Sequence, residues 1–462
     1  MYDIAINNGT IVEPKTKLMT VGNIGIKDGI IQAVTREKID ADKSIDATDK
    51  IVCPGFVDIH SHINFPLTPA WMSVKQGITT ALSGNCGLTP QTPIKDYLDK
   101  IEKGGYPLNF ATLVGHSWRL REMAGLNDPY DTANPDQVKK MVEIAEEALE
   151  QGAFGISLGL EYSPGANKEE YLPLVALAAK YDKLVPIHIR TDALDFAVGL
   201  REAIAMMEKT GARVHISHLA YSFGVHPEVT EMAFVMIRNA IKKGLPLLCD
   251  SGVYEAFATY VQSAVFDEGW HERYGVQLSD LMISSGKYTG ERCTPEIYDY
   301  VRNQETDTVG TAFTGVWPDL VMAIQQPFTM ISTDAGLVDA PGEGHPQDSG
   351  TYPKVFEKLV REEGALTMME AVYKSTYMPA MQMGIADKKG FIATGADADI
   401  VVFDPRTIKS NSDYVGLGQP DAAPTGVEYV IVNGVAVVEE SEAKEDRLPG
   451  QVLRQTNKPW SI

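Results

Sequence analysis

Residue types that bind metal ions in proteins close several apolar runs of this chain. The first run is IVCPGFVDIHSH, in which His60 and His62 lie two positions apart. Residues two apart on a strand point to the same face, so both imidazoles could hold one ion from one side. Later runs end on a thiol, two imidazoles and a carboxylate, carried by Cys86, His188, His218 and Asp334.

These residue types together suit zinc chemistry. The thiolate of Cys86 could bind zinc and bridge two ions, and the histidines supply further ligands. The carboxylate of Asp334 could contact the metal and its bound water, take a proton from that water and return it to a leaving nitrogen. Each residue alone has a structural interpretation, such as a core histidine, a buried thiol or a helix-capping aspartate. Their shared position at strand ends favours a metal-dependent hydrolase that splits an amide-type C–N bond.

The middle of the chain alternates apolar strands with amphipathic helices, which indicates a parallel α/β fold. Eight strand candidates end near His60, Cys86, His116, Leu160, Arg190, His218, Asp250 and Asp334. The clearest helix has Asn134 as N-cap, Pro135 in its first turn and Gly152 as its stop. Eight such units over roughly 340 residues predict a (β/α)8 TIM-type barrel, which carries its chemistry at the carboxyl ends of the strands.

Both chain ends read as short strands separated by Asn-Gly and Asp-Gly turns. We therefore predict a small β-sandwich built from residues 1–54 and 392–462, with the barrel at 55–391 inserted between them. The longest insertion, about 252–325, falls between strands seven and eight. A loop of that length beside a barrel mouth usually forms a lid or a wall of the substrate site.

Composition excludes several classes of protein. The net charge of -21 argues against nucleic acid or an anionic membrane as a partner. The N-terminus reads as a strand, and no apolar run approaches the roughly 20 residues that span a bilayer. Four widely spaced cysteines suggest a reduced, cytoplasmic setting.

No phosphate loop or Gly-x-Ser-x-Gly elbow stands out, so we expect neither a nucleotide cofactor nor a serine nucleophile. We expect a small-molecule amide substrate, and the sequence is compatible with a homo-oligomer.

The ligand pattern resembles the amidohydrolase superfamily, and more closely its D-aminoacylase (N-acyl-D-amino-acid deacylase) branch. The segments similar to that branch are GNCGLTP at 84–90, GISLGLEYSPG at 155–165, HIR at 188–190, ISHL at 216–219 and HPQDSGTYPKV at 345–355. By this resemblance, Cys86, His188 and His218 form a tight zinc site, and His60 and His62 share Cys86 in a weaker second site. Asp334 is then the acid–base residue, and the reaction is N-acyl deacylation of a linear amide.

Three positions depart from that branch. Its deacylases generally read the substrate α-carboxylate with a lysine after the strand-six ISH segment, an arginine in a His-Pro-Arg loop and a tyrosine past the strand-seven aspartate. Those places hold Ala220, Gln347 and Gly252. A carboxylate buried without a cationic partner is costly. We therefore expect a substrate without an α-carboxylate, or one whose carboxylate binds through Arg190, Lys287 or another group.

Further residues are candidates for the pocket around this centre. Glu161, after strand four, could be an extra metal ligand, although the position also suits a wall residue. Tyr254, at the start of the insertion, could replace the missing tyrosine, and His345 could line the pocket from the loop after strand eight.

Three more polar residues lie near the predicted rim. Arg190 shares a strand face with the strand-five ligand and could bind a substrate oxygen, or only brace the rim with Asp192. His116 ends strand three and could bond substrate or serve the structure. His215 is an odd number of positions from His218, so strand alternation predicts that it faces away.

Two rival functions remain open at this stage. One is a cyclic amide hydrolase resembling hydantoinases and dihydroorotases, which usually carry a carboxylated lysine on strand four, where GISLGL offers none. The other is a metal-binding protein without catalysis, against which the presence of Asp334 argues.

Overall fold

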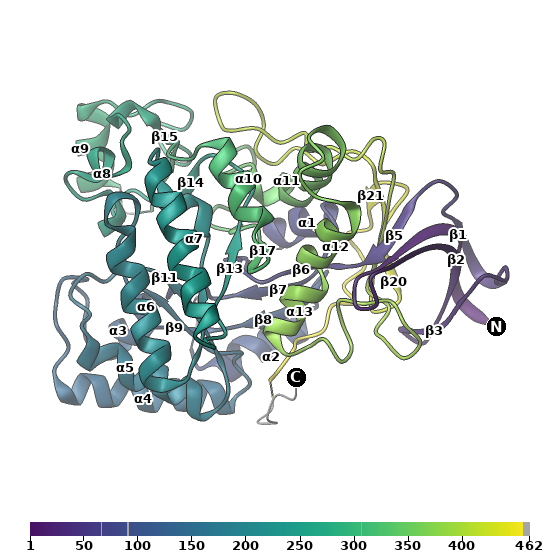
Figure 1. Cartoon of the computed structure of the whole chain (residues 1–462), viewed down its shortest axis with the longest axis horizontal. Coiled ribbons are helices and arrows are strands. Elements are labelled where there is room, and N and C mark those ends of the chain that lie inside the picture. Colours follow the sequence, from purple (N-terminus) through teal and green to yellow (C-terminus); the bar gives the residue numbers. More distant parts are fainter. Residues whose placement is uncertain (66, 90–91, 306, 456–462) are drawn as a thin grey trace.

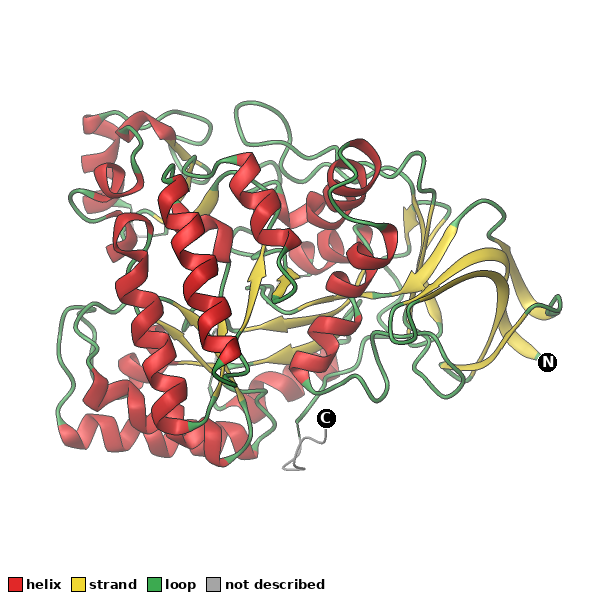
Figure 2. Cartoon of the chain, viewed as in Figure 1, coloured by secondary structure: helices red, strands yellow, loops and turns green. Residues whose placement is uncertain are grey.

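The computed structural model describes residues 1–65, 67–89, 92–305 and 307–455, and it joins an α/β region to a mostly antiparallel sheet at one end (Figures 1 and 2). Pro90 of the GNCGLTP segment and residues 456–462 of the predicted second sandwich part lie outside the described residues. Within the described residues, no helix combines the length and the apolar character needed to cross a membrane.

Buried parallel strands form the centre of the α/β region. They are β6 (Phe56–Asp58), β7 (Ile78–Ser83), β8 (Asn109–Thr112), β9 (Val114–Gly115), β10 (Ile156–Gly159), β11 (Leu184–His188), β12 (Arg213–Ile216), β13 (Leu248–Ser251) and β17 (Thr329–Ile331). In the part of the chain that is described, they pair as β6-β7-β8 and as β17-β13-β12-β11-β10-β9. Each predicted strand end falls within three residues of an observed one, so the predicted α/β pattern is confirmed.

Helices pack along these strands (Figure 1). They are α1 (Thr68–Lys75), α2 (Ile94–Gly104), α3 (Arg121–Met123), α4 (Pro135–Glu150), α5 (Lys168–Lys180), α6 (Phe196–Thr210), α7 (Pro227–Lys242), α10 (Trp317–Gln325), α11 (Gln347–Lys354), α12 (Met368–Ser375) and α13 (Tyr377–Met383). Helix α4 begins as predicted, because the Asn134 side chain accepts hydrogen bonds from the backbone N–H groups of Asp136 and Gln137. Its apolar face buries Met141 and Leu149 against the core.

The predicted insertion folds into a small unit of its own. Strands β14 (Phe257–Tyr260), β16 (Val309–Ala312) and β15 (Leu281–Ile283) pair antiparallel in that order, beside α8 (Trp270–Tyr274) and α9 (Pro295–Gln304). Phe266, Trp270 and Leu281 are buried in a separate apolar cluster. The predicted end of the insertion at 325 is too late, because α10 packs on β13 and β17 and so belongs to the α/β region.

Both chain ends contribute to one sheet, at the right of Figure 1. Its strands are β1 (Tyr2–Glu13), β2 (Leu18–Lys27), β3 (Ile30–Thr35), β4 (Ala41–Asp46), β5 (Ile51–Pro54), β18 (Ile400–Phe403), β19 (Val427–Val432), β20 (Val435–Glu439) and β21 (Glu442–Ala443). The two ends meet where β5 pairs antiparallel with β18, Cys53 opposite Val401. The last described residues leave this sheet, since Val452 forms a parallel bridge with Phe110 next to the α/β core.

Candidate metal centre

The metal-binding residue types converge at the carboxyl ends of the parallel strands. Cys86 Sγ lies 3.3 Å from His60 Nε2 and 3.6 Å from His218 Nε2. Asp334 Oδ1 lies 3.1 Å from the Nε2 atoms of both His60 and His62. Cys86 also groups with His188 and His218, all three offering ligand atoms within 4.8 Å of one another. Residues spread over most of the α/β region therefore face one small volume, as the sequence predicted.

Turns rather than strand alternation aim three of these side chains. Cys86, His218 and Asp334 have φ angles of 53°, 38° and 60°, in the left-handed region that non-glycine residues rarely adopt. Such a backbone costs roughly 1–3 kcal/mol each and persists only where neighbouring contacts hold it. The Asp334 N–H donates to the His60 carbonyl at 2.8 Å, and the His218 N–H donates to Asp250 Oδ1 at 3.0 Å.

Asp250 at the end of β13 joins several of these elements below the metal-binding atoms. Its carboxylate contacts His60 Nδ1 at 3.2 Å and accepts from the Ser332 hydroxyl at 2.6 Å. Burial alone raises the pKa of Asp250, but the charge of His60 and the bonds from His215 and His60 outweigh it and hold that pKa well below its usual range. The bond fixes His60 with Nε2 facing the centre. The sequence placed Asp250 at a strand end but did not identify this role.

The prediction that His215 faces away from the site is wrong. Its Nε2 lies 2.5 Å from Asp250 Oδ2, directly behind the centre. Strand alternation does not extend from His215 to His218, because β12 ends at Ile216. The left-handed backbone at His218 then changes the direction of its side chain. Both histidines therefore reach the same buried network.

The electrostatics of the cluster suit a divalent cation. Burial raises the pKa of the Cys86 thiol, but His60, His188 and His218 outweigh it and hold the pKa well below its usual value. Burial also raises the pKa of Asp334, and the charge and hydrogen bonds of His60, with His62, reverse this. Burial lowers the pKa values of His62 and His188, yet their anionic neighbours bring them to about 9 and about 10.

A thiolate and a carboxylate thus draw positive charge onto the surrounding imidazoles. Thiolate, imidazole and carboxylate are the donors that zinc takes in proteins, so the residues present fit this ion. A divalent cation would supply the positive charge in place of protons on the imidazoles. The other thiols differ, because Cys53, Cys249 and Cys293 are buried without such partners and burial raises their pKa values.

Glu161 lies beside this cluster, as expected for a candidate extra ligand. Its Oε2 is 2.9 Å from His188 Nε2, and its Oε1 accepts from Arg273 of α8. Glu161, His188 and Asp192 also form a group whose ligand atoms lie within 4.8 Å of one another. Burial, followed by the nearby charge of Asp192, raises the pKa of Glu161.

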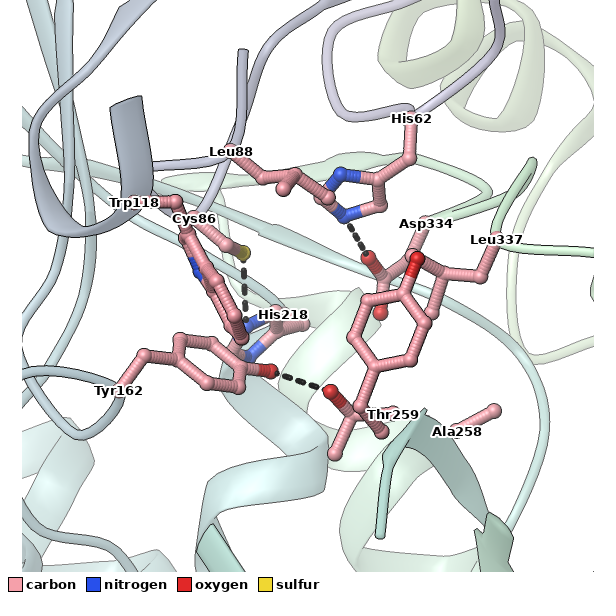
Figure 3. Close-up of a pocket in the computed structure, with 11 residues that line it drawn as sticks. His62, Cys86, Leu88, Trp118, Tyr162, His218, Ala258, Thr259, Asp334 and Leu337 are labelled. Atoms are coloured by element: carbon pink, nitrogen blue, oxygen red, sulfur yellow. Dashed lines mark hydrogen bonds and ion pairs between the residues drawn. The ribbon is translucent and has the colours of Figure 1, made fainter. Parts of the chain in front are cut away.

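The centre opens into a pocket with two lobes that share Tyr162, His218, Ala258 and Asp334. The first lobe is lined in addition by His62, Cys86, Leu88, Trp118, Thr259, Tyr260 and Leu337 (Figure 3). The second is lined in addition by His188, Asp192, Tyr221, Phe257, Val265 and Tyr274. Residues of β14 and α8 form one wall of both lobes together, so the insertion lines the pocket as predicted.

Most of the aromatic lining had no clear signal in the sequence. Trp118 lies in a short helical turn, His116–Leu120, that follows β9, and Tyr221 lies in the turn after the strand-six ligand. Tyr162 belongs to the GLEYSPG segment that resembles the deacylase branch, but no role in the pocket was predicted for it. Aromatic residues in loops are also common in cores, so their types alone did not mark a binding surface.

Of the two roles that the sequence left open for Arg190, the structure supports the bracing of the rim. Its guanidinium Nε donates to Glu202 Oε2 at 2.9 Å, and its Nη2 donates to the Ala166 carbonyl at 2.7 Å. Arg190 is absent from the described lining of both lobes. It braces the rim, but through Glu202 of α6 rather than through Asp192, because the guanidinium is already engaged on that side.

His116 also serves the structure rather than the pocket. Its Nε2 lies 2.7 Å from Glu170 Oε1, a buried carboxylate that also accepts from Arg121 Nη1 at 2.6 Å. Burial lowers the pKa of His116, which keeps the ring neutral. Of the two roles that the sequence left open for His116, these contacts support the structural one.

The remaining substrate candidates lie behind or outside the pocket lining that is described. Tyr254 bonds through its hydroxyl to Ser410 and Ser412, and its ring lies 5.4 Å from that of His345. His345 accepts from the Gln347 N–H, and burial lowers its pKa to about 3. Lys287 packs over tyrosine rings of the insertion. None of the three is in the described lining of either lobe, and their contact with substrate stays a prediction.

The three positions that bind the substrate carboxylate in the deacylase branch hold uncharged residues in this chain, and these residues contact their protein neighbours. Gln347 Nε2 donates to the Asp334 carbonyl at 2.6 Å, and its Oε1 accepts from the Tyr221 hydroxyl at 3.3 Å. A Cβ atom at Gly252 would lie 2.2 Å from the Tyr221 hydroxyl oxygen. Ala220 is buried beside them. Among the described residues, neither lobe is lined by a lysine or an arginine.

Known proteins resemble this chain over nearly its whole length. The profile of the Amidohydrolase family matches residues 51–437. An N-acyl-D-glutamate deacylase from Alcaligenes xylosoxydans xylosoxydans is 28% identical over 98% of this chain and 96% of its own. The structure of an N-acyl-D-glutamate deacylase from Bordetella bronchiseptica, complexed with zinc and a phosphonate inhibitor, has a TM-score of 0.86 with 27% identity, covering 98% of this chain and 100% of that one. A D-aminoacylase structure with a binuclear metal centre has the same TM-score and coverage at 25% identity.

Proposed function

Because the chain belongs to the amidohydrolase family, we propose that it hydrolyses the linear amide bond of an N-acyl compound with bound zinc. The observation that carries this proposal is the convergence of Cys86, four imidazoles and Asp334 on one pocket. The names of its relatives, N-acyl-D-glutamate deacylase and D-aminoacylase, support the same reaction class. A cyclic amide hydrolase is less well supported, since β10 offers no lysine for carboxylation.

The proposed scaffold is a closed (β/α)8 barrel at 55–391 with a β-sandwich from residues 1–54 and 392–462. A parallel bridge between Ser61 and Ala335 supports closure, because it links the ends of β6 and β17. A 2.9 Å bond from the Leu113 N–H to the Ser83 carbonyl supports continuity between β7 and the β8–β9 segment. The bridge at Val452 supports a place against the barrel, rather than in the sandwich, for the last described residues.

For the metal, we assign Cys86, His188 and His218 to a tight zinc site. His60 and His62, sharing Cys86 and near Asp334, form a weaker second site in this proposal. Glu161 is close enough to His188 to act as an extra ligand at the first site. The support is the donor set and its grouping into two clusters that share the thiolate.

Zinc, when bound, polarises the scissile carbonyl and brings the pKa of a bound water to about 7. In the proposed reaction, Asp334 accepts the proton of the attacking water and delivers it to the leaving nitrogen. Two backbone contacts hold Asp334 for this task, its N–H on the His60 carbonyl and its carbonyl on Gln347. The insertion wall, with Ala258 and Thr259, limits the access of bulk water to the shared part of the pocket.

We further propose that the substrate lacks the α-carboxylate of the N-acyl-D-amino acids. The support is that uncharged residues occupy the three positions that bind this carboxylate in the deacylase branch. One of them, Gln347, accepts a hydrogen bond from the Tyr221 hydroxyl. A carboxylate placed there would be desolvated without a cationic partner from the described lining, at a cost of several kcal/mol.

A substrate screen with the zinc-loaded protein tests these proposals. The panel contains N-acetyl, N-formyl and N-succinyl D- and L-amino acids, each beside its neutral amide analogue, and hydantoin and dihydroorotate as cyclic controls. We expect hydrolysis of linear amides, with the neutral member of each pair preferred. Activity confined to the cyclic compounds would overturn the reaction class, and a clear preference for the free acids would overturn only the claim about the carboxylate.

A further inference from the structure

Asp192 brings a buried carboxylate to the second lobe of the pocket. It follows β11, its residue exposure is 3%, and it lines the lobe. The Tyr274 hydroxyl donates to its Oδ2 at 3.0 Å. Its Oδ1 is buried without a hydrogen-bond partner among the described residues. A buried carboxylate oxygen without a donor is costly, so the geometry calls for a donor that the described protein does not supply.

Aromatic residues line the same lobe as this carboxylate. The lobe is lined by Tyr162, Tyr221, Phe257 and Tyr274, and the ring centroids of Phe257 and Tyr274 lie 5.6 Å apart. The faces of such rings carry partial negative charge and attract ammonium groups, and several rings around one carboxylate form a cage for a cation.

The arginine beside this lobe is engaged elsewhere. Arg273 of α8 donates to Glu161 Oε1, and its guanidinium lies 5.4 Å from the Tyr274 ring centroid. It is not part of the lobe lining, and no described residue forms an ion pair with Asp192. Arg273 is therefore engaged with Glu161, and Asp192 Oδ1 stays open to a hydrogen bond from a cationic group of a ligand.

We propose that this lobe binds an alkylammonium group of the substrate, with the ammonium donating to Asp192 Oδ1 inside the aromatic rings. The inference rests on the proposed function in one respect, that the scissile amide lies at the shared part of the pocket next to Asp334. One arm of the amide then extends into the first lobe and the other toward Asp192. The substrate class is an N-acyl compound with a positively charged arm.

A binding experiment that needs no turnover tests the cation site. The probes are n-hexylammonium and 1-hexanol, which have the same chain and carry no amide, titrated by calorimetry into the zinc-loaded protein. We expect n-hexylammonium to bind at least tenfold more tightly than 1-hexanol. In Asp192→Asn this preference should fall by roughly 10- to 100-fold, as for loss of a hydrogen bond to a charged group.

The asparagine variant is chosen to keep the fold. Its amide oxygen can still accept from the Tyr274 hydroxyl, while its NH2 group replaces the oxygen that faces the cation. Asp195→Asn is the matched control, because it removes the same charge from an exposed position three residues away. The ratio of the two probes is the readout, since partial unfolding would weaken both signals and leave their ratio unchanged.

Two pairs of amides test which arm of the substrate occupies this lobe during hydrolysis. One pair is N-(5-aminopentyl)acetamide with N-hexylacetamide, and the other is N-methyl-6-aminohexanamide with N-methylheptanamide, which put the charge on opposite arms. We expect the charged member of one pair to have the higher kcat/KM. In Asp192→Asn this preference should disappear, which is read as the ratio of kcat/KM between the two members of the pair.

The outcomes separate this proposal from the proposed function. Equal binding of the two probes, or a preference that survives Asp192→Asn or is equally lost in Asp195→Asn, overturns the ammonium site. So does loss of one equivalent of zinc in Asp192→Asn without any ammonium preference, which would make the cluster with Glu161 and His188 a metal site instead. Ammonium binding that depends on Asp192, with no hydrolysis of any amide, would contradict the proposed reaction and leave the cation site standing.

Discussion

The floor and the wall of the pocket are built in different ways. The floor consists of the candidate metal ligands His60, His62, Cys86, His188, His218 and Asp334 at the ends of buried strands, and Asp250 holds two of them, His60 and His218. The wall consists of aromatic and neutral side chains from loops and from the insertion, with Trp118 37% exposed. Strand ends in a packed sheet are rigid, whereas loops tolerate substitution and insertion.

This difference separates reaction class from specificity. The floor of this chain carries the donor types by which the amidohydrolase resemblance was recognised, while the clamp positions Ala220, Gln347 and Gly252 differ from that branch. A scaffold of this kind accepts many substrates by variation of its loops. Similarity to known deacylases therefore supports the reaction class more strongly than it supports the identity of the substrate. Changes to the floor should therefore abolish the reaction, and changes to the wall should redirect or weaken binding.

The largest expected effect is on the floor at Cys86. The variant Cys86→Ser replaces a thiolate shared by both ligand clusters with a neutral hydroxyl. Four-ligand zinc sites are worth roughly 10–16 kcal/mol, so one ligand is worth about 3 kcal/mol, over 100-fold in affinity. We expect zinc content, measured by mass spectrometry after dialysis, and activity to fall together. Cys293→Ser is the control, a buried thiol in the insertion that should keep both; full zinc occupancy in the Cys86 variant would show that the floor is not organised around the thiolate.

The next effect separates catalysis from metal binding. In Asp334→Asn the carboxamide keeps the shape of the side chain but cannot accept the proton of the attacking water. We expect kcat to fall by roughly 10²- to 10⁴-fold, the usual contribution of a general acid–base group. Zinc at the proposed tight site should be retained, because Asp334 is not in the group of Cys86, His188 and His218. A variant that keeps kcat would exclude Asp334 as the proton carrier.

The sequence predicted the floor better than the wall for physical reasons. His60, His62 and His188 follow buried strands, where apolar runs and alternation define position. Left-handed backbone then turns Cys86, His218 and Asp334 in directions that strand alternation does not describe, and the turn at His218 is why His215 was assigned to the wrong face. The sequence left the role of Arg190 open between substrate and rim because its partner Glu202 comes from another element, and such pairing depends on how helices pack.

An intermediate effect is expected beneath the floor at Asp250. The variant Asp250→Asn keeps the hydrogen bond from the His218 N–H. It replaces the charged oxygen that contacts the rings of His60 and His215, so both of these interactions weaken. Partners that orient metal ligands typically contribute 10- to 100-fold in metal affinity or activity. We expect the loss to appear mainly in the zinc equivalent held by His60 and His62, measured by competition with a chromogenic chelator.

A matched change tests whether that loss is specific. Ser332→Ala removes only the 2.6 Å hydroxyl donor to the same carboxylate, so it should have a smaller effect on zinc affinity. Unchanged affinity for both zinc equivalents in Asp250→Asn would mean that Asp250 stabilises the fold without positioning His60. A melting temperature measured for each variant separates that case from a general loss of stability.

The smallest effect is expected on the wall at Trp118, whose ring lies 5.8 Å from that of Tyr162 and 6.1 Å from that of Tyr260. Trp118→Leu keeps an apolar surface but removes aromatic contacts worth about 0.5–1.5 kcal/mol. If the wall governs binding and the floor governs chemistry, KM should rise roughly 2- to 10-fold while kcat and zinc content stay constant. Trp317→Leu, on α10 outside both lobes, is the control. A fall in kcat with constant KM would contradict the division between the two regions, because a residue of the wall would then stabilise the transition state itself.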